Sequence, residues 1–224
     1  MADVIVPTPE AALPGSLRMP VVHRGTVVFA HGSGSSRLSP RNQAVAGALE
    51  REGFATLLFD LLTPEEALDR RNVFDIALLA RRLEEATRWL RTELPEEKPL
   101  GFFGASTGAA AALLAAADLG EAVSAVVSRG GRPDLAPAAL PRVTAPTLLI
   151  VGSRDTDVLE LNRSALGLMR SNARLEVIEG ATHLFEEVGA LERVADLASD
   201  WFKAHLSGGT SRNRGSEGAR STPG

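Results

Sequence analysis

Residues 100–112 of the chain read Leu-Gly-Phe-Phe-Gly-Ala-Ser-Thr-Gly-Ala-Ala-Ala-Ala. An apolar run leads into Gly-x-Ser-x-Gly, and an alanine-rich run follows, which predicts a strand, a sharp turn at Ser106 and a helix. Such a turn strains the backbone of the turning residue, and glycines at 104 and 108 avoid the collisions that side chains there would cause. The hydroxyl of Ser106 is therefore predicted to project from the end of a strand. It would lie above a helix N-terminus, which favours negative charge.

The motif alone does not establish chemistry, because a chance match is expected in about one in ten chains of this length. The alternative is an ordinary glycine-flanked serine at a strand-to-helix turn. A serine hydroxyl is a weak nucleophile unless a base lies within hydrogen-bond reach and a third group orients that base. The rest of the chain must therefore supply both groups.

Composition points to a globular enzyme-sized domain. The 224 residues are 44% hydrophobic and 23% charged, which fits one α/β domain with a large core. The net charge of −4 gives no indication of nucleic acid or an anionic membrane as a partner. There is no cysteine, which excludes disulfides, thiolate metal sites and a cysteine nucleophile.

Localisation and cofactors are predicted from the same survey. The first residues lack the basic region and long apolar core of a signal peptide, and no apolar stretch could span a bilayer. The four histidines form no metal-binding motif. We therefore expect a cytoplasmic protein with no metal or organic cofactor, and we leave its oligomeric state open.

Alternating strand and helix patterns run through the chain. The predicted strands are 4–6, 15–19, 25–30, 54–59, 100–104, 122–128, 147–151 and 174–178. The predicted main helices are 40–52, 74–94, 107–117, 161–170 and 191–206, the first with Ser39 as its N-cap and Pro40 at its first position. Thr63-Pro64-Glu65-Glu66 reads as a capping box that starts a short helix, and a second short helical piece is expected at 135–140. We infer one α/β domain over residues 1–206, with helices on both faces of a mostly parallel sheet of about eight strands. Residues 207–224 are almost devoid of apolar side chains and are predicted to form a disordered tail.

Right-handed crossovers bring all the strand-to-helix loops to one edge of such a sheet, where ligands bind. Two of these loops carry the missing groups. Asp155 and Asp157 follow the strand at 147–151, and His183 follows the last strand. Ser106, Asp155 and His183 stand in the chain order of the α/β hydrolases. Asp155 is the preferred acid, and Asp157 is its alternative.

Four segments give the chain a specific resemblance. They read Phe-Ala-His-Gly at 29–32, Gly-Ala-Ser-Thr-Gly at 104–108, Val-Gly-Ser-Arg-Asp at 151–155 and Gly-Ala-Thr-His-Leu-Phe at 180–185. The span from about Val4 to His205 resembles the α/β-hydrolase superfamily, in particular its dienelactone-hydrolase-like branch. Dienelactone hydrolases proper use a cysteine nucleophile, whereas this chain has Ser106. Lactone specificity and that family's substrate-binding residues are therefore not carried over.

The roles follow from the geometry of a serine triad. Ser106 would attack an acyl carbon, His183 would take and return the proton, and Asp155 would orient the imidazole. The oxyanion hole is predicted to combine the backbone N–H of Thr107 with that of Ser33, with Gly34 as the alternative second donor.

Other residues at this edge are candidates for substrate binding. They are His31, Gly32, Gly34 and Arg129. For His31, bracing the loop is the simpler interpretation. For Arg129 and Arg132, the simpler interpretation is that they form a salt bridge or belong to a solvated turn. One of them could instead pair with a substrate carboxylate or phosphate.

The short segment between the sixth and seventh strands leaves no room for a lid domain. We therefore predict a lidless serine hydrolase that cleaves a small carboxylic ester or thioester through an acyl-enzyme. Acyl transfer or C–C bond hydrolysis by the same triad remains an alternative. So does a non-catalytic binding or regulatory protein, because fold does not fix function.

Overall fold

The computed structural model describes residues 2–94 and 98–206, so the tail predicted for residues 207–224 lies outside the described part. One sheet of eight strands, ordered β1-β2-β4-β3-β5-β6-β7-β8, forms its centre. The strands are β1 Ala2–Pro7, β2 Ala12–Arg18, β3 Thr26–Ala30, β4 Ala55–Phe59, β5 Leu100–Ala105, β6 Ala125–Arg129, β7 Thr147–Gly152 and β8 Ala173–Ile178. β1 pairs antiparallel with β2 and β2 with β4, whereas the pairs from β4 to β8 are parallel. The predicted mostly parallel sheet is confirmed.

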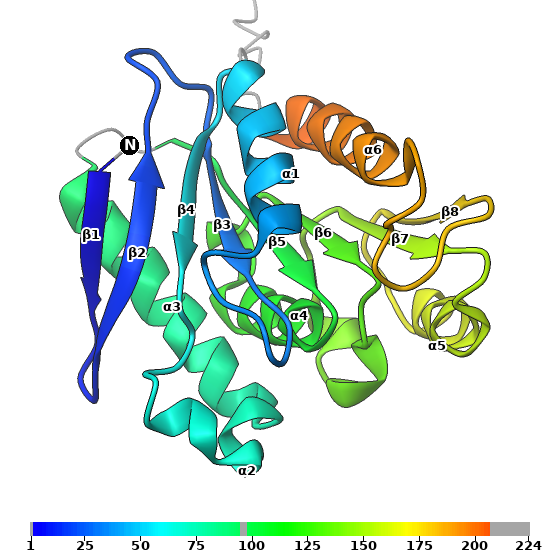
Figure 1. Ribbon diagram of the computed structural model, residues 1–224, viewed down its shortest axis with the longest axis horizontal. Helices are drawn as coiled ribbons and strands as arrows, with labels where there is room; N and C mark the ends of the chain where they lie inside the picture. Colours follow the sequence, from blue (N-terminus) through cyan, green and yellow to red (C-terminus); the bar gives the residue numbers. More distant parts are fainter. Residues whose placement is uncertain (1, 95–97, 207–224) are drawn as a thin grey trace, which may run out of the picture.

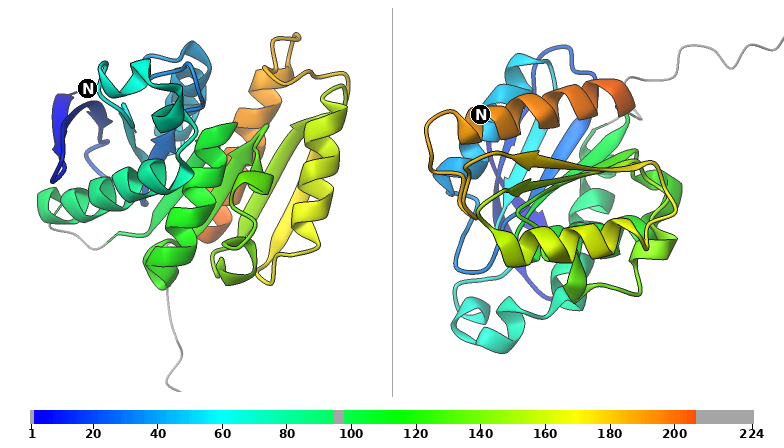
Figure 2. Two further views of the ribbon diagram at one scale, coloured as in Figure 1. Left: turned by 90° about the horizontal axis from the view of Figure 1, so that it is seen from below. Right: turned by 90° about the vertical axis from the view of Figure 1, so that its right-hand side faces the viewer.

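Helices cover both faces of the sheet. They are α1 Pro40–Arg51, α2 Arg70–Val73, α3 Ile76–Glu93, α4 Thr107–Leu119, α5 Thr156–Leu166 and α6 Ala190–His205. α1 and α6 pack together on one face, and α3, α4 and α5 lie on the other (Figures 1 and 2). The molecule is therefore a three-layer α/β/α structure, as the alternating pattern predicts.

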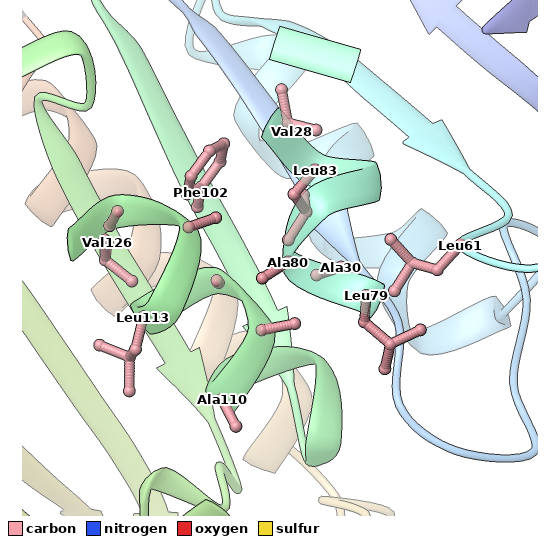
Figure 3. Packing of buried hydrophobic residues seen from close by; sticks show 14 of the residues in the cluster. Val28, Ala30, Leu61, Leu79, Ala80, Leu83, Phe102, Ala110, Leu113 and Val126 are labelled. Carbon is pink, nitrogen blue, oxygen red and sulfur yellow. The ribbon is translucent and has the colours of Figure 1, made fainter. Parts of the chain in front are cut away.

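The central strands are buried on both faces, and their side chains alternate between two cores. In β3, Val28 packs with α3 and α4, whereas its neighbour Phe29 packs with α1 and α6. Figure 3 shows the first of these cores, where Phe102 of β5 and Leu83 of α3 face each other across the layer. This two-sided burial explains why the strands read as continuous apolar runs in the sequence.

Local capping determines where two elements begin. The Ser39 hydroxyl accepts the N–H of Asn42 at 3.3 Å at the start of α1, next to Pro40. Thr63 and Glu66 form the reciprocal capping box that the sequence predicts: the Thr63 N–H reaches the Glu66 carboxylate at 2.9 Å, and the Glu66 N–H reaches the Thr63 hydroxyl at 3.2 Å. The turn that follows is a 3₁₀ helix, Glu66–Leu68.

Two elements begin at least three residues earlier than the sequence predicts. β2 begins at Ala12, ahead of the predicted start at 15, because its residues 12–17 pair with β1. α5 begins at Thr156, not at 161, with Asp155 at its N-cap position. The polar residues of this first turn read as loop in the sequence, although acidic residues are common where a helix begins.

The segment between β6 and β7 forms only two 3₁₀ turns, Pro133–Leu135 and Leu140–Arg142. No lid domain is inserted there, as predicted. None of the described helices combines the length and the apolar character needed to cross a membrane.

Candidate active site

Ser106 lies at the turn between β5 and α4 with a backbone φ of 52°, a strained value for a residue with a side chain. The flanking glycines are required for two different reasons. A Cβ at Gly104 would lie 2.5 Å from the Cα of Ala109 in α4, and a Cβ at Gly108 would lie 2.3 Å from the carbonyl oxygen of Ala30 in β3. The glycines therefore let α4 pack closely against both β5 and β3, which fixes the direction of Ser106.

His183 and Asp155 are hydrogen-bonded to each other, with 2.6 Å between Nδ1 and Oδ2. Asp155 lies in the turn between β7 and α5, and His183 lies in the loop after β8. The Asp155 side chain is 15% exposed, whereas that of His183 is 38% exposed. Asp157, the alternative acid, is exposed on the first turn of α5. The structure thus pairs His183 with Asp155.

The imidazole of His183 lies over the end of β6, the strand next to β5. A Cβ at Gly130, whose φ is 51°, would lie 3.4 Å from His183 Nδ1. The backbone N–H of Ser106 donates to the carbonyl oxygen of Arg129 at 3.1 Å, so the two turns are joined. Within the described residues there is no hydrogen bond between the Ser106 hydroxyl and His183, and such bonds are often loose without substrate.

The loop after β3 lies against Ser106. A Cβ at Gly32 would be 3.0 Å from the Cβ of Ser106. The backbone N–H of Ser33, the predicted oxyanion donor, points to the Oγ1 of Thr107 and donates to it at 2.9 Å. The sequence predicts a role only for the backbone N–H of Thr107. The structure adds that the Thr107 hydroxyl connects the two predicted donor residues.

His31 supports this loop with both ring nitrogens. Nδ1 lies 3.0 Å from the carbonyl oxygen of Gly32, and Nε2 accepts the N–H of Leu61 at 3.1 Å. This network assigns a neutral imidazole protonated on Nδ1, and burial lowers its pKa despite the opposing effects of Gly32 and Asp60. Neither nitrogen is left for a substrate, which agrees with the bracing interpretation.

A cavity of about 320 Å³ lies between the loop after β3 and the segment that follows β4. Ser33 and Thr107 line its end near Ser106, and Leu61, Leu62 and Val73 give it an apolar wall. The sequence did not reveal this cavity, because it forms between segments that are distant in the chain.

Two arginines of the predicted candidates have different surroundings. Arg132 pairs with Asp134, with contacts of 2.8 and 2.7 Å, which is the salt bridge that its position suggested. Arg129 is only 8% exposed and pairs with no carboxylate in the described part of the chain.

In residues 2–94 and 98–206, no three His, Asp or Glu side chains gather in a way that could hold a metal ion.

A family model described as an alpha/beta hydrolase domain matches residues 23–198. The chain belongs to the α/β-hydrolase family. A crystal structure of a dienelactone hydrolase from Anabaena variabilis is 55% identical to this α/β hydrolase, covers 92% of this chain and 97% of that one, and superposes with a TM-score of 0.88. The dienelactone-hydrolase-like resemblance inferred from the sequence motifs is thereby confirmed.

More distant solved structures share the fold. Est1E from Butyrivibrio proteoclasticus is 16% identical, with 91% of this chain and 98% of that one covered and a TM-score of 0.79. A Pyrococcus furiosus esterase is 20% identical, with coverages of 92% and 91% and a TM-score of 0.73.

Curated relatives from two Mycobacterium tuberculosis strains are 61% identical over 203 residues and are provisionally named phosphoribosyl transferases. The match covers 90% of this α/β hydrolase but only 45% of those proteins, so the chain spans less than half of their length.

Proposed function

We propose that this chain is a serine hydrolase that cleaves a small carboxylic ester or thioester through an acyl-enzyme. The observation that carries the proposal is the convergence of three groups at one sheet edge. Ser106 occupies a strained turn at a helix N-terminus, and the hydrogen-bonded pair His183 and Asp155 lies over the neighbouring strand. This combination of nucleophile, base and orienting acid is the one that serine acyl transfer requires.

In this mechanism the Ser106 Oγ attacks the acyl carbon while His183 Nε2 takes its proton. The C–O or C–S bond to the leaving group then breaks, and the imidazolium returns the proton to the departing alcohol or thiol. Water attacks the acyl-enzyme by the same route and releases the acid and free Ser106. Asp155 holds the imidazole with Nδ1 protonated, so that Nε2 faces the serine as a base.

The negative oxygen of each tetrahedral intermediate would accept hydrogen bonds from the backbone N–H groups of Thr107 and Ser33. The Ser33 N–H is held by the Thr107 hydroxyl when no substrate is bound. We therefore propose that the oxyanion shares or displaces this contact as it forms. The adjacent cavity of about 320 Å³, with Leu61, Leu62 and Val73 in its wall, fits a short acyl or alkyl chain.

The mycobacterial relatives are named for phosphoribosyl transfer. They are more than twice as long as the segment that matches this chain, so the name describes proteins with additional sequence. Ser106 in its strained turn and the His183–Asp155 pair over the neighbouring strand are groups that acyl chemistry uses, and the hydrolase proposal rests on them. Acyl transfer to another acceptor would use the same first half-reaction.

The test is covalent labelling by a fluorophosphonate probe, followed by hydrolysis of p-nitrophenyl acetate and butyrate. Wild-type protein should be labelled, and Ser106→Ala should lose both labelling and at least about 10⁴-fold in kcat, as expected for loss of the nucleophile. Ser124→Ala is the matched control. Ser124 directly precedes β6, at the edge of the sheet away from Ser106, so this variant should behave as wild type. Unlabelled wild-type protein, or equal labelling of both variants, would exclude a serine nucleophile at position 106 and favour a non-catalytic protein.

A further inference from the structure

Arg129 is a buried cation next to the candidate triad. Its residue is 8% exposed, and its Nη1 is buried without a hydrogen-bond partner in the described part of the chain. A Cβ at Gly131 would overlap the hydroxyl of Ser128 and lie 2.8 Å from the Cβ of Ala109 in α4. The Ser128 side chain therefore lies on the α4 side of the sheet. Because side chains alternate along a strand, Arg129 faces the opposite layer, where α1 and α6 lie.

The other deeply buried arginine shows how this fold normally compensates such a charge. The side chain of Arg82 is 1% exposed and has carboxylate oxygens of Glu66, Glu10 and Glu85 at 2.9, 3.2 and 3.8 Å. Arg129 has no such partner among the described residues. Burying a charge without compensation is costly, so a buried arginine that lacks a carboxylate calls for an anion from elsewhere.

A second guanidinium adds to the positive charge. The positive charge of Arg41, from the first turn of α1, acts on Arg129. The Nη1 of Arg41 binds the Glu186 carboxylate at 3.2 Å, but its Nε is buried and has no described partner. Burial, and to a smaller extent Arg41, lowers the pKa of Arg129 to about 10, so Arg129 remains charged at neutral pH.

We propose that Arg129 and Arg41 form a subsite for an anionic group, a carboxylate or a phosphate, carried by the substrate that Ser106 attacks. The inference rests on the proposed hydrolase function. The main chain that carries Arg129 lies beside the reacting groups: the Arg129 carbonyl oxygen accepts the N–H of Ser106 at 3.1 Å, and the next residue, Gly130, packs against the His183 ring. A guanidinium is suited to this role because its planar fork pairs with both oxygens of a carboxylate or phosphate.

Binding can be measured without catalysis. Ser106→Ala protein is titrated by calorimetry with succinate and, separately, with inorganic phosphate. We expect saturable binding of at least one anion, and the one that binds identifies the group. Affinity should fall about tenfold or more in Ser106→Ala/Arg129→Met, because charged hydrogen bonds are lost. Ser106→Ala/Arg163→Met, which changes an exposed arginine of α5, is the control and should keep the affinity. Binding of neither anion, or equal binding by all three proteins, would overturn the subsite.

The catalytic arm compares esters of matched length with and without the acidic group. The p-nitrophenyl monoesters of succinate and of 3-phosphonopropionate are compared with p-nitrophenyl pentanoate. The ratio of acidic to neutral kcat/KM should fall roughly tenfold to a hundredfold in Arg129→Met. Arg129→Lys should restore part of the ratio, and Arg163→Met should leave it unchanged. An unchanged ratio in Arg129→Met would reject the proposal.

Wild-type protein provides a measurement that does not depend on the folding of any variant. The anion that binds in the titration should inhibit hydrolysis of the neutral ester competitively, because it would occupy part of the same site. Non-competitive or absent inhibition would contradict a substrate subsite. If no ester is hydrolysed at all, the hydrolase proposal fails, and the titration of Ser106→Ala still decides whether the arginines bind an anion.

Discussion

Two acidic residues of one loop have different environments, although the sequence presents them two positions apart. Asp155 is half-buried and bonded to His183 at 2.6 Å, whereas Asp157 is exposed on α5. Asp155 also occupies the N-cap position of α5, but its side chain makes no capping hydrogen bond. Replacing its carboxylate therefore tests the contact with His183 without removing a helix cap.

The exchange Asp155→Asn should lower kcat for p-nitrophenyl butyrate by up to about 10⁴-fold, because an amide at this position favours the wrong imidazole tautomer. Asp157→Asn is the matched control and should change kcat only slightly. Steady-state kinetics of both variants make the comparison. A large loss in the Asp157 variant alone would reverse the assignment of the triad acid.

Thr107 illustrates a contact that joins two parts of the site at the residue level. Its hydroxyl accepts the N–H of Ser33, which is 74 positions away in the chain. Its own backbone N–H lies at the start of α4, where helix N–H groups have no partner within the helix. One residue thus positions both predicted donors, the first through its side chain and the second through its main chain.

At the scale of elements, α4 and β3 approach each other so closely that only glycine fits between them. A Cβ at Gly108 would lie 2.3 Å from the Ala30 oxygen and 2.5 Å from the His31 oxygen. Both atoms belong to the backbone, so the contact cannot be relieved by turning a side chain. This approach also brings Ser33 within reach of Thr107.

We expect Gly108→Ala to lower the free energy of unfolding by about 1–3 kcal/mol, because α4 must move away from β3. Activity should fall as well, since the loop after β3 would shift relative to Ser106. Gly47→Ala in α1 is the matched control: its Cβ would meet only the Arg51 side chain at 3.7 Å. That variant should gain about 0.5–1 kcal/mol, as alanine favours a helix interior. Urea unfolding measures both, and equal effects would contradict the close approach.

At the scale of the whole molecule, a charge cluster around the buried Arg82 holds the antiparallel edge to the helical layer. Arg82 of α3 binds Glu66 before α2, and also Glu10 and Thr8 in the turn between β1 and β2. Burial raises the pKa of Glu85 in the same cluster, against the opposing attraction of Arg82. The cluster is therefore a structural counterpart to Arg129, with the acids that Arg129 lacks.

Arg82→Met should lower the free energy of unfolding by about 3–5 kcal/mol, because it leaves several acidic groups close together without their cation. Arg88→Met, which breaks the exposed pair with Glu84, should cost less than about 1 kcal/mol. Chemical denaturation of both variants at neutral pH provides the measurement. A similar cost for the two would show that the cluster does not hold the edge strands in place.

Much of this architecture could be predicted because its causes are local. Apolar runs buried on both faces indicate the parallel strands, proline and serine indicate the start of α1, and the glycines around Ser106 indicate the strained turn. The sequence does not indicate that α5 begins at Thr156, since the polar first turn of this helix carries no apolar periodicity. The cavity beside Thr107 was not predicted, because its walls come from segments far apart in sequence.

The sequence by itself determined the fold class and the chain order of Ser106, Asp155 and His183 in loops at one sheet edge, because alternating strands and helices with right-handed crossovers bring those loops to the same edge. Only the tertiary structure decided that Asp155, not Asp157, meets His183, and that Arg129 is buried without the carboxylates that surround Arg82. The physical reason is range. Backbone sterics and hydrophobic periodicity act over a few residues, whereas the partner of a charged side chain depends on how distant loops pack.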